Sequence, residues 1–146
     1  MSEASKPVWF ILFVVVGLAT VVMIARSRAI SGGGGDGQGV VPWQTDLAAA
    51  REQSARDGKP ILLYFTADWC PPCKKMKSST WVDSKVAGVI RTAYIPVMID
   101  VDQQQAASQA YGVSGIPRVE VLSANGDRRL VTEGYLAPGE MVAALK

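Results

Sequence analysis

The chain divides into two parts by its pattern of apolar and polar residues. Val8 to Ala25 form one continuous apolar run, whereas the sequence from Val40 onward alternates short apolar stretches with more polar ones. As a helix rising ~1.5 Å per residue, the first run would be about 27 Å long, close to the hydrocarbon thickness of a bilayer. We therefore expect one transmembrane helix, with Trp9 near one interface and Arg26 at the other end. A cleaved signal peptide is the alternative.

These patterns define four segments: a tail at 1–7, a transmembrane anchor at 8–25, a Gly-rich linker at 26–39 and a folded domain at 40–146. The glycines of the linker predict a flexible tether. Basic residues stand on both sides of the apolar run, so the charges do not fix its orientation. The run contains no cysteine, so the chain cannot carry electrons across a membrane by thiol exchange. A transmembrane electron-donor protein is therefore an expected partner.

The folded domain alternates predicted helices and strands, which indicates the α/β class with a central mixed β-sheet flanked by helices. Strands are expected at Ile61 to Thr66, Tyr94 to Val101, Val119 to Ser123 and Arg128 to Glu133. Helices are expected at Asp46 to Asp57, from Cys70 to about Thr80, after Asp83 to Arg91, at Gln103 to Tyr111 and at Pro138 to Leu145. Thr45 is the expected N-cap of the first helix and Gly58 ends it. Asn125-Gly126 predicts a hairpin turn.

Candidate chemistry is concentrated where the first strand meets the second helix. The chain has two cysteines and no histidine, and Cys70 and Cys73 stand two residues apart at this point. Pro71 and Pro72 suit the first turn of a helix, whose N-terminus stabilises a thiolate on Cys70. The nearby Lys74, Lys75 and Lys77 should lower the thiol pKa further. Cys73, one turn later, is placed to resolve a mixed disulfide.

Other functions of the cysteine pair have less support in the sequence. A structural zinc site needs about four ligands, and covalent haem attachment needs a histidine where Lys74 stands. A copper-binding pair is disfavoured by the stiff Pro-Pro loop. An inert disulfide stays open, although such a short loop removes little entropy from the unfolded chain. With 15 basic and 13 acidic residues interspersed, no nucleic-acid surface is indicated, and we expect no metal site and no cofactor.

Three stretches carry a family resemblance: Phe65 to Lys74, Val97 to Asp102 and Tyr111 to Pro117. In their order and spacing they resemble the thioredoxin superfamily, and within it the membrane-tethered thioredoxin-like domains that include the C-terminal domain of the bacterial transmembrane disulfide reductase. The resemblance extends over about a hundred residues and implies a thioredoxin-like fold.

The resemblance also implies roles for particular residues. It makes Cys70 the attacking thiol and Cys73 the resolving thiol. It makes Pro117 a cis proline that faces the cysteines, so that the backbone of Ile116 is exposed to a substrate peptide. Trp69 would cover the active site.

The chain departs from the thioredoxin pattern at a buried ion pair. Thioredoxins place an aspartate on the strand before the motif and a lysine on the next strand, and Tyr64 and Met98 occupy these positions here. Replacing both partners avoids a stranded buried charge but leaves no evident carboxylate base for Cys73. Tyr64, Asp68 and water are the candidates for this proton transfer. Arg118 is expected to form a surface ion pair or to favour acidic partners.

The apolar run and the family resemblance together predict a membrane-tethered thiol:disulfide oxidoreductase of the bacterial cytoplasmic membrane, and the resemblance to extracytoplasmic reductases implies a domain outside the cytoplasm. We expect it to reduce, or relay electrons to, protein disulfides through its Cys-Pro-Pro-Cys dithiol, including those of cytochrome maturation. A disulfide oxidant or isomerase is the alternative within the enzyme class. A non-catalytic adaptor with a static disulfide is the alternative outside it.

Overall fold

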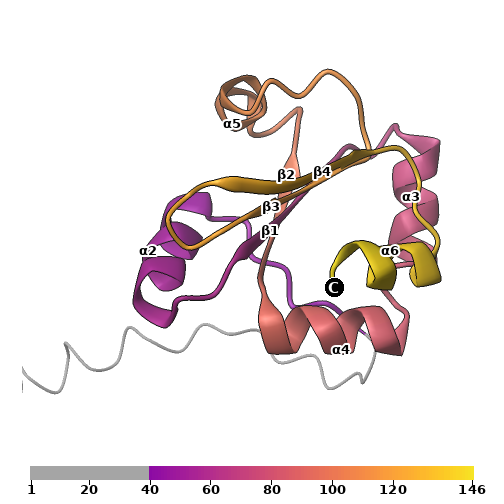
Figure 1. Ribbon diagram of the computed structural model, residues 1–146. Helices are drawn as coiled ribbons and strands as arrows, with labels where there is room; N and C mark the ends of the chain where they lie inside the picture. Colours follow the sequence, from indigo (N-terminus) through magenta and orange to yellow (C-terminus); the bar gives the residue numbers. More distant parts are fainter. Residues whose placement is uncertain (1–39) are drawn as a thin grey trace, which may run out of the picture. The chain divides into compact units, whose positions relative to one another are not determined.

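The computed structural model describes residues 40–146. Its centre is a four-stranded sheet in the order β2-β1-β3-β4 (Figure 1). The strands are β1 (Ile61–Thr66), β2 (Ile95–Asp100), β3 (Arg118–Leu122) and β4 (Arg128–Glu133). β2 runs parallel to β1, whereas β3 is antiparallel to both β1 and β4. The predicted mixed sheet is confirmed, with β1 and β4 at the expected bounds.

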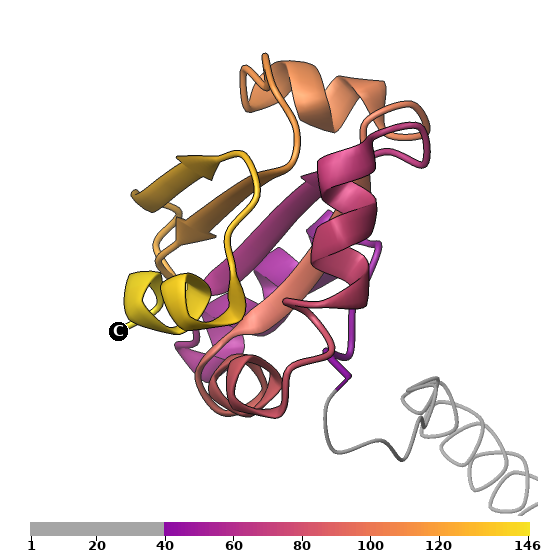
Figure 2. The same cartoon turned by 90° about the vertical axis from the view of Figure 1, so that its right-hand side faces the viewer.

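Helices cover both faces of the sheet, as expected. They are α2 (Leu47–Asp57), α3 (Pro71–Ser78), α4 (Ser84–Ala93), α5 (Gln105–Ala110) and α6 (Pro138–Ala144). Because successive strand residues point to opposite faces, Leu62 and Tyr64 pack against α3, α4 and α6, while Leu63 and Phe65 pack against α2 and α5. Figure 2 shows α3 and α6 in front of the strands. The site therefore rests on a sheet that is buried on both sides.

The first helix begins one residue later than the sequence indicated. Asp46, not Thr45, is the N-cap, because its backbone is extended and its carboxylate accepts the backbone N–H of Ala49 at 3.0 Å. The helix ends at Gly58, whose φ of 68° lies in the left-handed region that glycine adopts without strain. The N-cap prediction was wrong because Thr45 and Asp46 are both good caps, and pattern alone does not choose between neighbours.

The helix expected at Gln103 to Tyr111 is shorter, Gln105–Ala110. The carboxylate of Asp100 accepts the backbone N–H groups of Asp102 and Gln103, which holds these residues in a turn. The hairpin between β3 and β4 is confirmed. Its turn closes with a bond from Gly126 N to Ser123 O at 2.8 Å, and Gly126 takes a φ of 90°.

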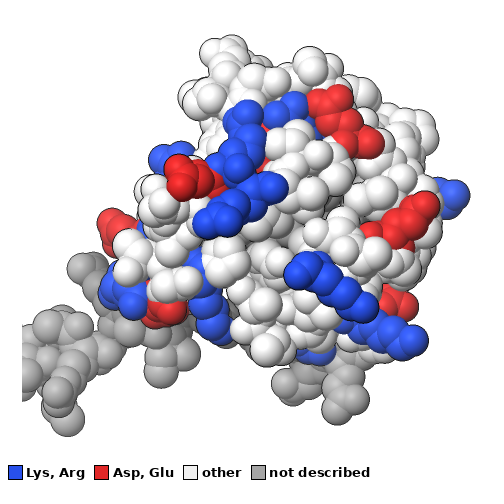
Figure 3. All heavy atoms as spheres, viewed as in Figure 1, with Lys and Arg blue, Asp and Glu red and all other residues white. Residues whose placement is uncertain are grey.

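The expected transmembrane anchor at Val8 to Ala25 and the linker after it lie outside the described residues. Among residues 40–146, no helix has the length and apolar character needed to cross a membrane. On the face of this domain shown in Figure 3, lysines and arginines are interspersed with acidic residues.

Candidate active site

The two cysteines lie at the turn between β1 and α3 and form a disulfide. Cys70 is the N-cap of α3, followed by prolines at the first two helical positions. Because proline has no N–H, the amide of Cys73 is the first backbone donor of the helix, and it donates to the Cys70 sulfur at 3.3 Å. The Pro-Pro loop therefore directs the first free helix N–H at Cys70, an arrangement that stabilises a thiolate there in the reduced state.

The disulfide is sheltered, and its two sulfurs are not equivalent. Cys70 is 2% exposed and Cys73 is fully buried. Both cysteines cluster with Ala67, and Val101 and Ile116 pack against the cluster. Of the two cysteines, Cys70 is the one that retains exposed surface. The attacking role of Cys70 and the resolving role of Cys73 stay predictions.

A groove of about 330 Å³ opens beside the disulfide. Its lining comes from the turn between β1 and α3, from the residue after β2, from α5 and from the loop before β3. It comprises Trp69, Val101, Ser108, Val113, Ser114, Gly115 and Ile116. Two of these residues, Val101 and Ile116, also contact the cysteine cluster. The Ile116-Pro117 peptide bond is cis, as expected. The groove is the natural place for a peptide segment next to Cys70.

Trp69 stands at the edge of this groove with 65% of its surface exposed. Its indole N–H donates to the carboxylate of Asp102 at 2.8 Å. The backbone of Asp102 is itself held by the Asp100 carboxylate at 2.9 Å. Sequence analysis did not assign Asp102 to the site, although this residue closes one of the three stretches that carry the family resemblance.

The lysines of α3 are partly neutralised. Lys77 lies 3.3 Å from the carboxylate of Asp68, and the Lys75 ammonium lies 4.2 Å from the ring centroid of Tyr135. The side chain of Asp68 is 94% exposed. Asp68 thus screens a positive charge at the surface and does not belong to the buried groups around Cys73.

Tyr64 lies on the other side of Cys73, in the core. Its side chain is fully buried, and its hydroxyl donates to the backbone carbonyl of Cys73 at 3.2 Å. Burial raises the pKa of Tyr64 from its ordinary value of 10.0, and contacts with Thr66 and Trp81 offset part of this rise. Met98 is the register partner of Tyr64 on β2, so the two departures from the thioredoxin pattern are neighbours.

The fully buried carboxylate of Glu120 was missed by sequence analysis. Glu120 faces Arg118 at 2.6 Å and Arg128 at 2.8 Å, and Arg118 also pairs with Glu133 at 2.7 Å. Burial lowers the pKa of Arg118, but the two glutamates outweigh this effect and raise it. The expected surface ion pair of Arg118 is therefore part of a network in which Arg118 and Glu120 are buried and the side chains of Arg128 and Glu133 are about half exposed. Arg118 is the register partner of Phe65 on β1, so the network lies on the face of the sheet opposite Tyr64.

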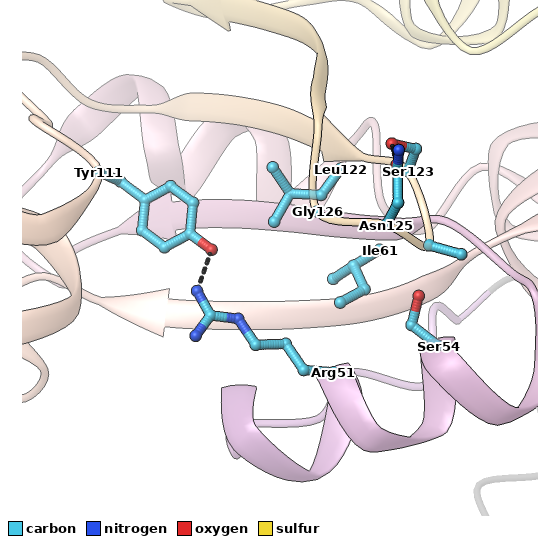
Figure 4. Close-up of a pocket in the computed structure, with 9 residues that line it drawn as sticks. Arg51, Ser54, Ile61, Tyr111, Leu122, Ser123, Asn125 and Gly126 are labelled. Atoms are coloured by element: carbon cyan, nitrogen blue, oxygen red, sulfur yellow. Dashed lines mark hydrogen bonds between the residues drawn. The ribbon is translucent and has the colours of Figure 1, made fainter.

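A second cavity, of about 290 Å³, lies next to the hairpin turn (Figure 4). Arg51 of α2 and Tyr111 point toward each other across it, with a hydrogen bond of 2.8 Å between the guanidinium and the hydroxyl. Ile61 and Leu122 provide apolar lining. This cavity contains no cysteine and shares no residue with the cysteine cluster, so it does not belong to the active site.

Comparisons with known proteins agree with this geometry. The model of the thioredoxin-like family matches residues 42–124. Thioredoxin 1 of Chlorobaculum tepidum is 33% identical over 82 residues, which are 56% of this chain and 77% of that protein. The thiol:disulfide interchange protein DsbD of Neisseria meningitidis is 30% identical over 101 residues, which are 66% of this chain but only 17% of that longer protein.

A solved structure extends the comparison to three dimensions. The oxidised C-terminal domain of Neisseria meningitidis DsbD superimposes with a TM-score of 0.59 at 28% identity, covering 69% of this chain and 94% of that domain. The matched family segment contains β1, both cysteines and the cis Ile116-Pro117 bond, which is the whole of the site described above. The chain therefore belongs to the thioredoxin-like family.

Proposed function

We propose that this protein is a membrane-tethered thiol:disulfide oxidoreductase that reduces, or relays electrons to, extracytoplasmic protein disulfides. The observation that carries the proposal is the position of Cys70, which caps α3, accepts the first free helix N–H and lies beside an open groove. A helix N-terminus lowers the pKa of such a thiol and so favours the attacking thiolate. A disulfide that served only as a staple would need neither feature.

The reaction would follow from this placement. In the reduced protein, the Cys70 thiolate attacks one sulfur of a substrate disulfide, and the other substrate sulfur leaves as a thiolate and takes up a proton. The Cys73 thiolate then attacks the Cys70 sulfur, which releases the second substrate thiol and forms the Cys70-Cys73 disulfide. The groove beside Ile116 would hold the substrate backbone next to Cys70.

The tether and the compartment are part of the same proposal. The apolar run at Val8 to Ala25 would anchor the domain in the bacterial cytoplasmic membrane, and the glycines that follow would let it reach its partners. The resemblance to membrane-tethered thioredoxin-like domains supports an extracytoplasmic domain that receives electrons from a membrane protein. Proteins of cytochrome maturation are candidate acceptors.

The reduction potential of the Cys70-Cys73 pair tests the direction of electron flow. The full-length protein in mild detergent would be equilibrated with glutathione or dithiothreitol buffers, and its thiol content measured. A potential near that of thioredoxin, about −270 mV, supports a reductant. A potential near about −120 mV would instead make the protein an oxidant.

Reduction of insulin separates catalysis from an adaptor role. The wild-type protein should reduce insulin disulfides with dithiothreitol as electron source, and Cys70→Ser should abolish this activity. Cys73→Ser should retain the attacking thiol and accumulate mixed disulfides with the substrate. If the wild type forms no mixed disulfide through Cys70, the static adaptor is the correct interpretation.

A further inference from the structure

The backbone of the resolving cysteine accepts a hydrogen bond from the neutral hydroxyl of Tyr64, which stands where thioredoxins place a carboxylate. Tyr64 of β1 is fully buried, and its hydroxyl donates to the carbonyl oxygen of Cys73 at 3.2 Å. Cys73 is the third residue of α3, so this bond ties the first turn of the helix to the central strand. The contact joins the side chain directly to the backbone that carries the resolving sulfur.

The environment of Tyr64 keeps its hydroxyl in place and protonated. The ring lies 5.6 Å from that of Trp43 and 5.0 Å from that of Trp81, centroid to centroid. The hydroxyl of Thr66 and the indole N–H of Trp81 contact the Tyr64 hydroxyl, although neither makes a hydrogen bond of normal geometry. Burial raises the Tyr64 pKa, so the group stays neutral at the pH where thiols exchange.

Carboxylates lie elsewhere. Within residues 40–146, the buried carboxylate is that of Glu120, which lies on the opposite face of the sheet between Arg118 and Arg128. Asp68 is exposed and paired with Lys77. Neither acid forms a hydrogen bond or ion pair with Tyr64, Cys70 or Cys73.

We propose that Tyr64 is a positioning residue for the resolving step and takes no part in its proton transfer. The proposal rests on the thiol:disulfide exchange proposed above. In this step the Cys73 thiolate attacks the Cys70 sulfur. The bond between Cys70 and the substrate breaks, the Cys70-Cys73 bond forms, and the substrate sulfur leaves with the electron pair and is protonated by water. Tyr64 neither gains nor loses a proton.

The two half-steps can be timed separately with an aromatic disulfide that releases a coloured thiolate. Mixing it with the reduced full-length protein should release one thiolate when Cys70 attacks and a second when Cys73 resolves. Tyr64→Phe keeps the ring and removes the hydroxyl. Loss of one net hydrogen bond should slow the second phase about three- to tenfold and leave the first phase unchanged. The pH midpoint of the second phase should stay where it is in the wild type.

Tyr94→Phe is the matched control. Tyr94 also donates its hydroxyl to a backbone carbonyl, that of Leu145 at 2.8 Å, but at the other end of the domain. This variant should leave both phases unchanged. Because an unfolded chain exposes both thiols to the reagent independently, the ratio of the two phases within one sample also reports whether Tyr64→Phe is folded.

The outcomes distinguish this inference from the proposed function. If the second phase of Tyr64→Phe matches the wild type, Tyr64 does not position Cys73. If the substitution moves the pH midpoint of that phase, Tyr64 takes part in proton transfer and the inference is overturned. If the wild type shows no first phase, Cys70 is inert and the proposed function fails with it.

Discussion

Replacing Glu120 should be the most damaging conservative substitution in the charged network. Its carboxylate is fully buried and lies within 2.8 Å of two guanidinium groups. Glu120→Gln removes the charge but keeps the shape, and it leaves Arg118 desolvated with Glu133 as its remaining acidic partner. Breaking a buried ion pair by removing one partner costs about 3–5 kcal/mol. Because Glu133 still neutralises part of the Arg118 charge, we expect about 2–4 kcal/mol.

Glu133→Gln is the control against which the loss of unfolding free energy in Glu120→Gln is compared. The Glu133 side chain is 46% exposed and makes one ion pair, again with Arg118. Partly solvated pairs contribute about 0.2–1 kcal/mol, so this variant should lose about 1 kcal/mol or less. Both substitutions change one carboxylate to an amide on the same network, and they differ mainly in burial.

Urea unfolding followed by tryptophan fluorescence measures both losses. A domain of this size has about 5–15 kcal/mol of stability and an m-value of ~1–3 kcal/mol/M, so the Glu120→Gln midpoint should fall by about 1–2 M. The double substitution Arg118→Met with Glu120→Leu should recover part of the loss, since it removes both buried charges. Equal losses for Glu120→Gln and Glu133→Gln would refute the reasoning, because burial would then not decide the energy of the network.

Three further predictions follow from single contacts. Asp46→Ala should cost about 1 kcal/mol in urea unfolding through loss of the α2 N-cap, and Thr45→Ala should be near neutral; the reverse order would return the cap to Thr45. Asp102→Ala should free the Trp69 indole, lowering its fluorescence anisotropy and slowing insulin reduction about two- to fivefold; unchanged anisotropy would mean that the 2.8 Å bond does not hold the ring in solution. Burial raises the pKa of Tyr64 above 10.0, so the unfolded chain loses this proton first, and the stability due to neutral Tyr64 is lost as the pH rises above about 10. Tyr64→Phe should flatten this alkaline decline in unfolding free energy, and an unchanged slope would show that Tyr64 does not titrate differently in the two states.

The elements that could be predicted from sequence are those whose signals are local. β1 is a run of apolar residues bounded by Pro60 and Ala67, and its predicted bounds match the structure. The turn that carries the cysteines could also be predicted from local sequence, because two prolines directly after Cys70 mark the start of a helix. Both features depend on neighbouring residues only.

The charged network could not be predicted, because its partners are distant in sequence. In a strand of alternating residues, Arg118 and Glu120 between Val119 and Val121 indicate a solvent-exposed face. The structure buries this face, since Arg128 on β4 covers Glu120 and completes its pairing. Nothing in the β3 sequence itself distinguishes a solvated glutamate from one that two arginines cover. The same holds for Asp102, which follows β2, because its partner Trp69 lies in the distant turn between β1 and α3.

The charged network and the Tyr64 hydroxyl that contacts the Cys73 backbone lie on opposite faces of the sheet. On one face, Arg118 directly follows the cis proline and pairs with Glu133 of β4. A Glu133 side-chain oxygen lies 3.6 Å from the position that a β-carbon would have at Gly115, in the loop before the proline. The backbone N–H of Gly134 donates to the carbonyl oxygen of Pro117 at 2.8 Å. On the other face, the groups behind Cys73 are neutral. A carboxylate titrating beside Cys73 would couple the thiol pKa to its own charge. The buried acid of this domain, Glu120, instead pairs with Arg118 and Arg128. The pH dependence of thiol exchange should therefore follow the ionisation of the thiols alone, while the ion pairs fix the loop that lines the groove.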